Sequence, residues 1–456
     1  MKTNTLKSCF IAGMLALATF GFAQERATIF GKPLGADYIN QETGKIQCVS
    51  YQYMEYLKDL DPSNFVARGT DEELPNEAEG TTQVLVIPVV VHVIHNGQSV
   101  GSGKNISDAR VLSQIKVLNE DFRRKVGTPG FGTNAAGVDV EIEFCLAQKA
   151  PDGSATNGIN RVNLGDLVWH RLNVEETLKP QTQWDPTKYF NIWVCEFGSH
   201  PHPNYDLDQV LGYAQFPSNS GLGGIPFTGD ADTDGVIIDW RCFGRVTEAP
   251  GSYFSGYNRG RTTTHEVAHA LGLRHIWGDN NYCTVNSVDS QKDFCPDTPP
   301  HKNPNDTCSA NSNTICTGYT PMPMNYMDYG TDNCLNTFTA NQKTRMRTAL
   351  QTATRRASLL TSDACQAPSA SIDNFGLEMV SMYPNPASNV LNIVLPDNYE
   401  LNGTVKVYNT LGQMVYNTTL SSANHHSIDV SGYQSGIYFV KVQNGSQTKT
   451  LQFVKQ

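Results

Sequence analysis

The chain has 456 residues, of which 39% are hydrophobic and 17% charged, and its formal net charge is −10. At roughly 100–200 residues per domain, this length predicts two to four domains, and the composition excludes a disordered polyampholyte. The acidic balance argues against nucleic acid as a partner, because nucleic acids are bound by clustered lysine and arginine. No internal apolar run reaches the roughly 20 residues of a membrane-spanning helix, so we expect no transmembrane segment.

Residues 1–23 have the features of a signal peptide. Two lysines precede an apolar stretch from Phe10 to Ala18, and small residues follow at Gly21 and Ala23. The alternative is a buried N-terminal helix. The pattern favours an exported protein.

Export into an oxidising compartment changes how the cysteines are interpreted. Of the 11 cysteines, Cys9 belongs to the signal peptide, and five of the others lie between residues 283 and 334. This clustering predicts disulfides rather than a thiolate metal site, and the absence of any C-x-x-C pair disfavours a zinc knuckle. The region 282–336 is rich in Asn, Asp, Pro and Thr and has little periodicity, so we expect it to be irregular and to depend on its disulfides.

The residues that follow the signal peptide predict a prosegment and then a sheet. Residues 24–80 are polar, which is typical of a prosegment or linker. From residue 84 to 94 the chain is apolar and β-branched, which predicts a buried strand. Ser107 is placed to cap a following helix with apolar residues on one face, and residues 339–360 are again helical. Further strands are expected at 138–146, 190–197, 235–240 and, as a short edge strand, 212–216. This alternation predicts an α/β sheet.

The strongest chemical signal is the segment HEVAHALGLRH, from His265 to His275. On a helix His265 and His269 share one face, so both imidazoles can bind one metal ion. Gly272 tolerates a positive φ and can turn the chain so that His275 supplies a third nitrogen. Glu266 points beside the metal, where it can take a proton from water. Three imidazoles and a water predict an open, catalytic Zn²⁺ site rather than a closed structural one.

This segment resembles the zinc motif of the metzincin metallopeptidases, which also carry a methionine in a downstream turn. The sequence NYMDY at residues 325–329 resembles that turn. The resemblance implies that Met327 forms an apolar floor under the histidines and that Tyr329 helps to stabilise the tetrahedral intermediate. Over residues 84–365 the chain resembles the pappalysin family of metzincins, whose bacterial members are secreted endopeptidases. We therefore expect an α+β metzincin domain at residues 81–365, with a mixed twisted sheet and an active-site helix.

The pappalysin resemblance also implies a disulfide pattern. It pairs Cys283 with Cys316 and Cys308 with Cys334. Cys295 is additional to that pattern, which leaves the pairing open.

Two further residues acquire roles by the same resemblance. Asp332 matches an acidic residue in the pocket for the residue after the cut, where it would select Arg or Lys by charge pairing. The alternative is a solvated loop aspartate.

Cys48 is a lone prosegment cysteine that can place a thiolate on the zinc and keep the enzyme latent. The alternative is a disulfide. The residues before Cys48 depart from the family's Arg-x-Cys pattern. With a preference for basic residues after the cut, Ala67–Arg68 becomes a self-activation site.

Structural Ca²⁺ is a second expected ion. Pappalysins resembling this chain bind calcium near the segment that contains Asp289, Asp293 and Asp297, although individual ligands stay unassigned. Residues 230–235 also resemble the start of a calcium loop, but its twelfth position is Arg241 instead of a glutamate. A turn before a strand is the favoured interpretation of that loop.

A change in composition at residues 366–377 predicts a linker. The last part, 378–456, has short alternating strands separated by turns and no cysteine, which predicts a small all-β sandwich. It resembles a type IX secretion sorting domain, which implies export by that machinery and later removal. The alternative is a carbohydrate-binding or adhesive sandwich.

These features predict a secreted zinc endopeptidase, either released or retained at the cell surface. Protein or peptide substrates would lie extended along the edge strand at 212–216. The competing hypotheses are a surface adhesin on a metzincin scaffold and a zinc hydrolase of non-peptide bonds. The intact Glu266 argues against the adhesin.

Overall fold

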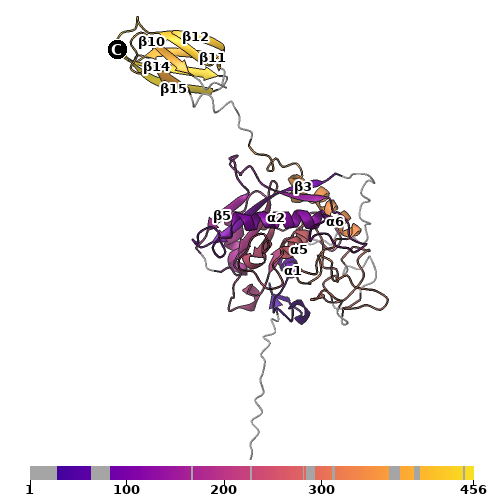
Figure 1. Cartoon of the computed structure of the whole chain (residues 1–456). Coiled ribbons are helices and arrows are strands. Elements are labelled where there is room, and N and C mark those ends of the chain that lie inside the picture. The colour runs from indigo at the N-terminus through magenta and orange to yellow at the C-terminus, as the bar shows by residue number, and fades with distance from the viewer. Residues whose placement is uncertain are drawn as a thin grey trace, which may run out of the picture. The chain divides into compact units, whose positions relative to one another are not determined.

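The computed structural model describes residues 28–62, 83–165, 168–225, 229–280, 282–283, 293–310, 314–368, 380–394, 401–444 and 447–456. The chain divides into two compact units, residues 1–367 and 368–456 (Figure 1). The expected signal peptide and Ala67–Arg68 lie outside the described residues. Within the described ranges, no helix has both the length and the apolar character needed to cross a membrane.

The first unit is built on a mixed sheet in the order β4-β3-β6-β8-β7, with β5 also paired to β3. Its strands are β3 (Leu85–His95), β4 (Ile142–Leu146), β5 (Ile159–Asn163), β6 (Phe190–Cys195), β7 (Gly212–Ala214) and β8 (Val236–Asp239). Neighbouring strands are parallel except for β7, which runs antiparallel to β8 at the edge. The predicted buried strand is β3, and the predicted edge strand is β7.

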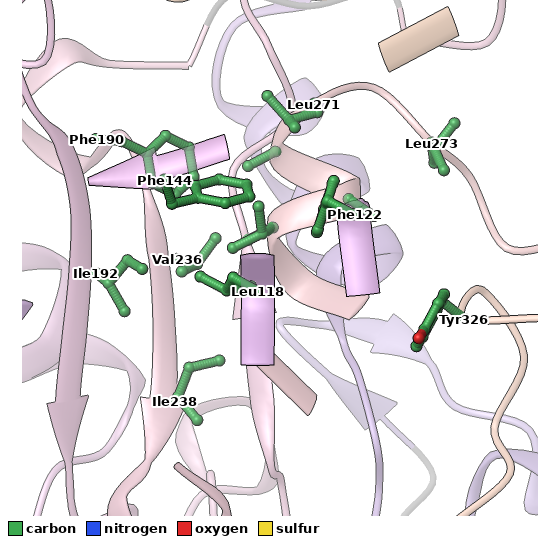
Figure 2. Packing of buried hydrophobic residues seen from close by; sticks show 14 of the residues in the cluster. Leu118, Phe122, Phe144, Phe190, Ile192, Val236, Ile238, Leu271, Leu273 and Tyr326 are labelled. Carbon is green, nitrogen blue, oxygen red and sulfur yellow. The ribbon is translucent and has the colours of Figure 1, made fainter. Parts of the chain in front are cut away.

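Helix α2 (Asp108–Phe122) begins as predicted, with the Ser107 side chain accepting a hydrogen bond from the Arg110 N–H. It packs against β4 and against α5 (Arg261–Ala270). Helices α2 and α5 are labelled next to each other in Figure 1. Figure 2 shows side chains from this helix and from the strands meeting in one interior: Leu118, Phe122, Phe144, Phe190, Ile192, Val236 and Ile238. The same core holds α5 in a fixed position over the sheet.

Other helices and turns surround this core. They are η1 (Ala36–Tyr38), α1 (Ser50–Leu60), α3 (Arg171–Asn173), η3 (Val174–Leu178), α4 (Lys179–Thr182), η4 (Pro203–Tyr205), η5 (Ala231–Thr233), η6 (Trp240–Cys242), α6 (Ala340–Thr352) and α7 (Thr354–Leu359). The last two account for the helical pattern predicted after residue 339.

The segment from residue 28 to 62 has regular structure that the sequence analysis did not predict. A small hairpin of β1 (Thr28–Ile29) and β2 (Lys32–Pro33) precedes α1, which contacts β7. Val49 and Tyr53 are buried in a cluster that includes residues of the sheet. The helix is stabilised by packing on a distant part of the chain, which local polarity does not reveal.

Among the described residues, three disulfides cross-link the first unit. Cys283–Cys316 and Cys308–Cys334 hold the largely irregular region, as the family resemblance implied. A third, Cys145–Cys365, ties β4 to the end of the unit and was not predicted. Cys48 is buried and forms no disulfide, so the alternative role for this residue is wrong.

The second unit is a sandwich of two antiparallel sheets. One contains β9 (Ser381–Tyr383), β10 (Val390–Val394) and β13 (His425–Asp429). The other contains β11 (Leu401–Asn409), β12 (Met414–Ala423), β14 (Gly436–Asn444) and β15 (Gln447–Lys455). Both sheets bury apolar residues in a common core, which confirms the predicted all-β sandwich.

Candidate metal centre

The histidine segment folds as its residue types predict. His265, Glu266 and His269 lie on α5, and the helix ends where Gly272 adopts a φ of +99°. A Cβ at Gly272 would lie 2.7 Å from Leu222 Cδ1, so glycine is required both by conformation and by space. The chain then turns and returns His275 toward the helix.

Two buried arginines fix the end of α5. Arg345 Nε donates to the Gly272 carbonyl at 2.7 Å, and Arg356 Nε donates to the Ala270 carbonyl at 2.8 Å. Arg356 also forms an ion pair with Asp234, 2.7 Å from Nη2 to Oδ1. These contacts satisfy carbonyl groups that a helix end leaves open and set the direction in which the chain leaves.

The three imidazoles converge at one point. Their Nε2 atoms lie 3.0 Å apart for His265 and His269, 3.1 Å for His269 and His275, and 3.2 Å for His265 and His275. All three side chains are buried. A tetrahedral zinc ion with Zn–N bonds of about 2.0–2.1 Å separates its ligand nitrogens by about 3.3–3.4 Å, close to these distances.

The contacts of the Nδ1 atoms show which nitrogen of each imidazole is protonated. Nδ1 of His265 faces the Tyr326 carbonyl at 2.6 Å, and Nδ1 of His269 faces the Leu273 carbonyl at 2.7 Å. Nδ1 of His275 faces a carboxylate oxygen. Each Nδ1 therefore carries a proton, and three Nε2 lone pairs point at one another. Such a donor set suits a cation. Burial lowers the pKa of His265 well below its usual value, which keeps this imidazole neutral.

Glu266 lies beside the histidine cluster and is fully buried. Its Oε2 accepts a hydrogen bond from the Ser50 hydroxyl at 2.7 Å and contacts Cys48 Sγ at 3.3 Å. Its Oε1 is buried without a hydrogen-bond partner among the described residues. Burial raises the pKa of Glu266 to about 8, and the contacts with Ser50 and Cys48 oppose this rise.

The segment NYMDY forms a turn behind the histidines. The Asp328 N–H donates to the Asn325 carbonyl at 3.0 Å, and Met327 between them is buried in the main core. The ring of Tyr329 lies 5.0 Å from that of His275. Its hydroxyl donates to the carbonyl of Cys48 at 2.9 Å. The structure therefore brings residues of the NYMDY turn and Cys48 to the same centre.

Cys48 reaches this centre on an extended segment. The Leu211 N–H donates to the Ile46 carbonyl at 2.9 Å, and residue 46 pairs with Val210 in a parallel bridge beside β7. Cys48 Sγ and one ring nitrogen from each histidine all lie within 4.8 Å of one another. Among the described residues this is the one group of three or more His, Cys, Asp or Glu side chains with metal-binding geometry.

Asp332 is 1% exposed, so it is not the solvated loop aspartate of the alternative interpretation. Its Oδ2 accepts hydrogen bonds from the Arg259 N–H at 2.6 Å and the Arg261 N–H at 3.4 Å. Burial raises the pKa of Asp332 to about 6. The carboxylate is buried, with backbone donors on one side.

The carboxylates considered for calcium have protein partners. Asp234 is paired with two arginines and precedes β8, as the turn interpretation of residues 230–235 predicted. Asp293 accepts from the Thr298 hydroxyl, and Asp297 accepts from the Asn341 N–H at 2.8 Å. Asp289 lies outside the described residues.

Sequence reasoning missed Ser50, which contacts Glu266. It also missed Asp279, which supplies the carboxylate behind His275. Ser50 carries no motif, and only the fold brings it near Glu266. Asp279 lies four residues after His275, so this spacing was a usable signal.

Comparison with known proteins agrees with this geometry. Residues 174–351 match the family described as Pregnancy-associated plasma protein-A. An extracellular metalloprotease of Arthroderma benhamiae is 36% identical over 265 residues, which cover 58% of this chain and 77% of the fungal protein. The chain belongs to the pappalysin family of metallopeptidases. It is therefore a zinc metalloendopeptidase.

Another relative and two solved structures agree with this assignment. Extracellular metalloprotease 1 of Coccidioides posadasii is 27% identical over 274 residues, covering 59% of this chain and 80% of that protein. Tannerella forsythia mature mirolysin in complex with a cleaved peptide is 38% identical, with a TM-score of 0.50 over 61% of this chain and 96% of that one. A promirolysin structure is 34% identical, with a TM-score of 0.50 over 68% of this chain and 91% of that one. The first unit has the mixed α/β fold of this family.

The second unit has a separate match. Residues 381–456 match a Secretion system C-terminal sorting domain. Together with the extracellular relatives, this match identifies the pappalysin as a secreted protein. Its residues 381–456 are the sorting domain for a secretion system.

Proposed function

We propose that this pappalysin hydrolyses peptide bonds in extended protein substrates with zinc held by His265, His269 and His275 and with Glu266 as the general base. The convergence of three lone pairs beside a buried carboxylate carries the proposal. Bound zinc lowers the pKa of water and polarises a carbonyl group. The unpartnered Oε1 of Glu266 is available to accept a proton and later to return it to the leaving amine.

Tyr329 is proposed to stabilise the oxyanion. Its ring lies beside His275, and its hydroxyl is directed at the carbonyl of Cys48 in the segment that covers the site. A hydroxyl that donates to a prosegment carbonyl in the latent chain can donate to a substrate carbonyl oxygen once that segment has left. Met327 is proposed to be the apolar floor of the site.

The edge strand β7 is proposed to bind substrate. The segment around Ile46 makes main-chain hydrogen bonds with Gln209 and Leu211, immediately before β7, which supports the binding of an extended chain along this edge. Gly212 lets β7 lie close to α5, because a Cβ at this position would be 3.1 Å from Glu266 Cγ.

Residues 24–80 are proposed to keep the enzyme latent. Cys48 places its sulfur at the histidine cluster, Ser50 occupies Oε2 of Glu266, and the Gln47 amide donates to the Asp328 carbonyl at 3.3 Å. The segment thus blocks the metal position, the base and the substrate edge together. Cleavage between residues 62 and 83, as at Ala67–Arg68, would release this segment from the enzyme.

Asp332 is proposed to select Arg or Lys after the cut. Its burial and its raised pKa fit a carboxylate at the bottom of a pocket, where a cationic side chain would replace lost solvation. The contacts with the N–H groups of Arg259 and Arg261 support the charged form. Structural calcium near Asp293 and Asp297 stays a prediction of the family resemblance.

The test uses the mature enzyme and its Glu266→Ala variant with denatured protein, with and without a zinc chelator, and maps the cuts by mass spectrometry. Chelator-sensitive cuts that Glu266→Ala lacks are expected, and cuts before Arg or Lys support Asp332. Cuts without basic preference overturn the Asp332 role alone. Folded, zinc-loaded enzyme that cuts nothing favours the non-catalytic scaffold.

A further inference from the structure

His275 is held differently from the other two histidines of the cluster. Nδ1 of His265 and of His269 faces backbone carbonyl oxygens, at 2.6 and 2.7 Å. Nδ1 of His275 faces Oδ1 of the Asp279 side chain. Of the three imidazoles, His275 alone has an acceptor that is a side chain and carries a charge.

The turn after His275 is shaped to make this contact. The Gly278 N–H donates to the His275 carbonyl at 2.9 Å, and Gly278 and Asp279 both have positive φ, +70° and +58°. Aspartate tolerates this conformation better than most residues. The indole of Trp277 stacks on the imidazole with ring centroids 4.4 Å apart and planes within 6°. Ring plane and ring rotation are thereby both fixed.

Asp279 is itself firmly held. Its side chain is 2% exposed, and its Oδ2 lies 3.7 Å from Arg274 Nη2. A buried carboxylate with a cation on one oxygen keeps the other oxygen pointed at the imidazole.

We propose that Asp279 is a positioning residue that fixes the Nδ1–H tautomer and the orientation of His275 and thereby sets how tightly the centre holds zinc. This inference rests on the proposed function, since it takes the three histidines as the zinc ligands. A carboxylate behind a ligating imidazole raises the basicity of the far nitrogen, and losing such a partner costs typically 10–100-fold in metal affinity.

The same carboxylate also contacts the prosegment. The Tyr38 hydroxyl donates to Asp279 Oδ1 at 3.2 Å and accepts from Trp277 Nε1 at 3.3 Å. The prosegment therefore approaches His275 from behind through Tyr38 and from the front through Cys48. Once it leaves, Oδ1 loses the Tyr38 contact and keeps that with His275, so the positioning effect belongs to the mature enzyme.

The test measures zinc affinity of the mature holoenzyme by competition with a calibrated chelator. Asp279→Ala is expected to weaken zinc binding about 10–100-fold. Asp279→Asn is expected to lose less, because its amide oxygen still accepts from Nδ1 without the charge. Glu120→Gln is the matched control, since that buried carboxylate pairs with Arg245 and its loss is expected to leave zinc affinity unchanged.

A second readout separates positioning from folding. Cobalt(II) replaces zinc, and a changed visible spectrum is expected in both variants. In Asp279→Ala the third ligand reorients, and in Asp279→Asn the loss of the charge weakens the donor strength of His275 Nε2. Thermal unfolding in excess chelator should be the same for Asp279→Asn and wild type. Zinc affinity within twofold of wild type together with an unchanged cobalt spectrum in Asp279→Asn overturns the proposal, even if Asp279→Ala fails to fold. A wild-type enzyme that binds no zinc overturns the proposed function itself.

Discussion

The hydroxyl of Ser50 donates a hydrogen bond to Oε2 of Glu266 at 2.7 Å and accepts one from the Ala214 N–H at 2.8 Å. One side chain of the proposed prosegment therefore contacts both the proposed general base and the edge strand. Both contacts are buried. Removing the hydroxyl therefore leaves Glu266 Oε2 and the Ala214 N–H each without this hydrogen-bond partner.

Replacing Ser50 is expected to loosen the latent state. In Ser50→Ala, the lost bonds to Glu266 and Ala214 weaken prosegment binding by about 2–3 kcal/mol, which corresponds to roughly 30–150-fold. The measurement is peptide cleavage by the full chain before any processing is visible on a gel, with higher initial activity expected. Mature enzyme made from the same variant should be unchanged, because it no longer contains residue 50. Equal initial rates in variant and wild type would contradict this role.

Helix α1 has a second buried contact with the sheet unit, which does not involve the histidine cluster. The Tyr53 hydroxyl donates to Glu175 at 2.5 Å, and the Lys179 ammonium contacts the same carboxylate at 2.6 Å. Tyr53→Phe removes one charge-assisted bond and should weaken inhibition by an added 24–80 peptide about 10–100-fold. Tyr56→Phe is the matched control, since it keeps the neighbouring aromatic contacts. An unchanged inhibition constant for Tyr53→Phe would show that the latency comes from Cys48 and its neighbours alone.

The sequence predicted the centre because its signals are local. His265 and His269 are one helical turn apart, and Gly272 is the residue that a positive φ requires, so short-range rules place them. The strand at 84–94 and the helix after Ser107 were predicted for the same reason. The NYMDY turn and two disulfides came from family resemblance, not from any physical rule about residues 283–334.

What the sequence did not predict depends on packing between distant segments. The helix α1 is polar in sequence and becomes ordered because Tyr53 and Val49 are buried on the sheet unit. Cys145 and Cys365 are 220 residues apart, and only the fold brings them together. The contact of Ser50 with Glu266 spans 216 residues and involves no motif.

Arg356 is expected to stabilise the exit from α5. It pairs with Asp234 and donates to the Ala270 carbonyl, and all three groups are buried. Arg356→Met leaves the carboxylate of Asp234 with Arg355 alone, and breaking a buried pair costs about 3–5 kcal/mol. Urea unfolding of the mature enzyme measures this loss. Lys149→Met, which breaks an exposed pair with Asp363, is the control and should cost less than about 1 kcal/mol.

The preference for a basic residue after the cut is expected to depend on pH through Asp332. Burial raises the pKa of Asp332 to about 6, so the carboxyl is charged above that pH and neutral below it. The ratio of kcat/KM for an Arg substrate to that for a matched Leu substrate should be constant at pH 7–8. It should fall about 10-fold for each pH unit below 6, because kcat/KM reports ionisation in the free enzyme.

Asp332→Asn provides the control for that profile. Its amide oxygen can still accept from the Arg259 N–H, so the loop is preserved while the charge is lost. The variant should show a low ratio that does not change with pH. If the wild-type ratio is flat across pH 6, or if Asp332→Asn keeps the preference for Arg, another residue forms the pocket. The backbone contacts of Asp332 would then be its whole role, since a buried carboxylate that only supports a loop has no effect on the choice between Arg and Leu.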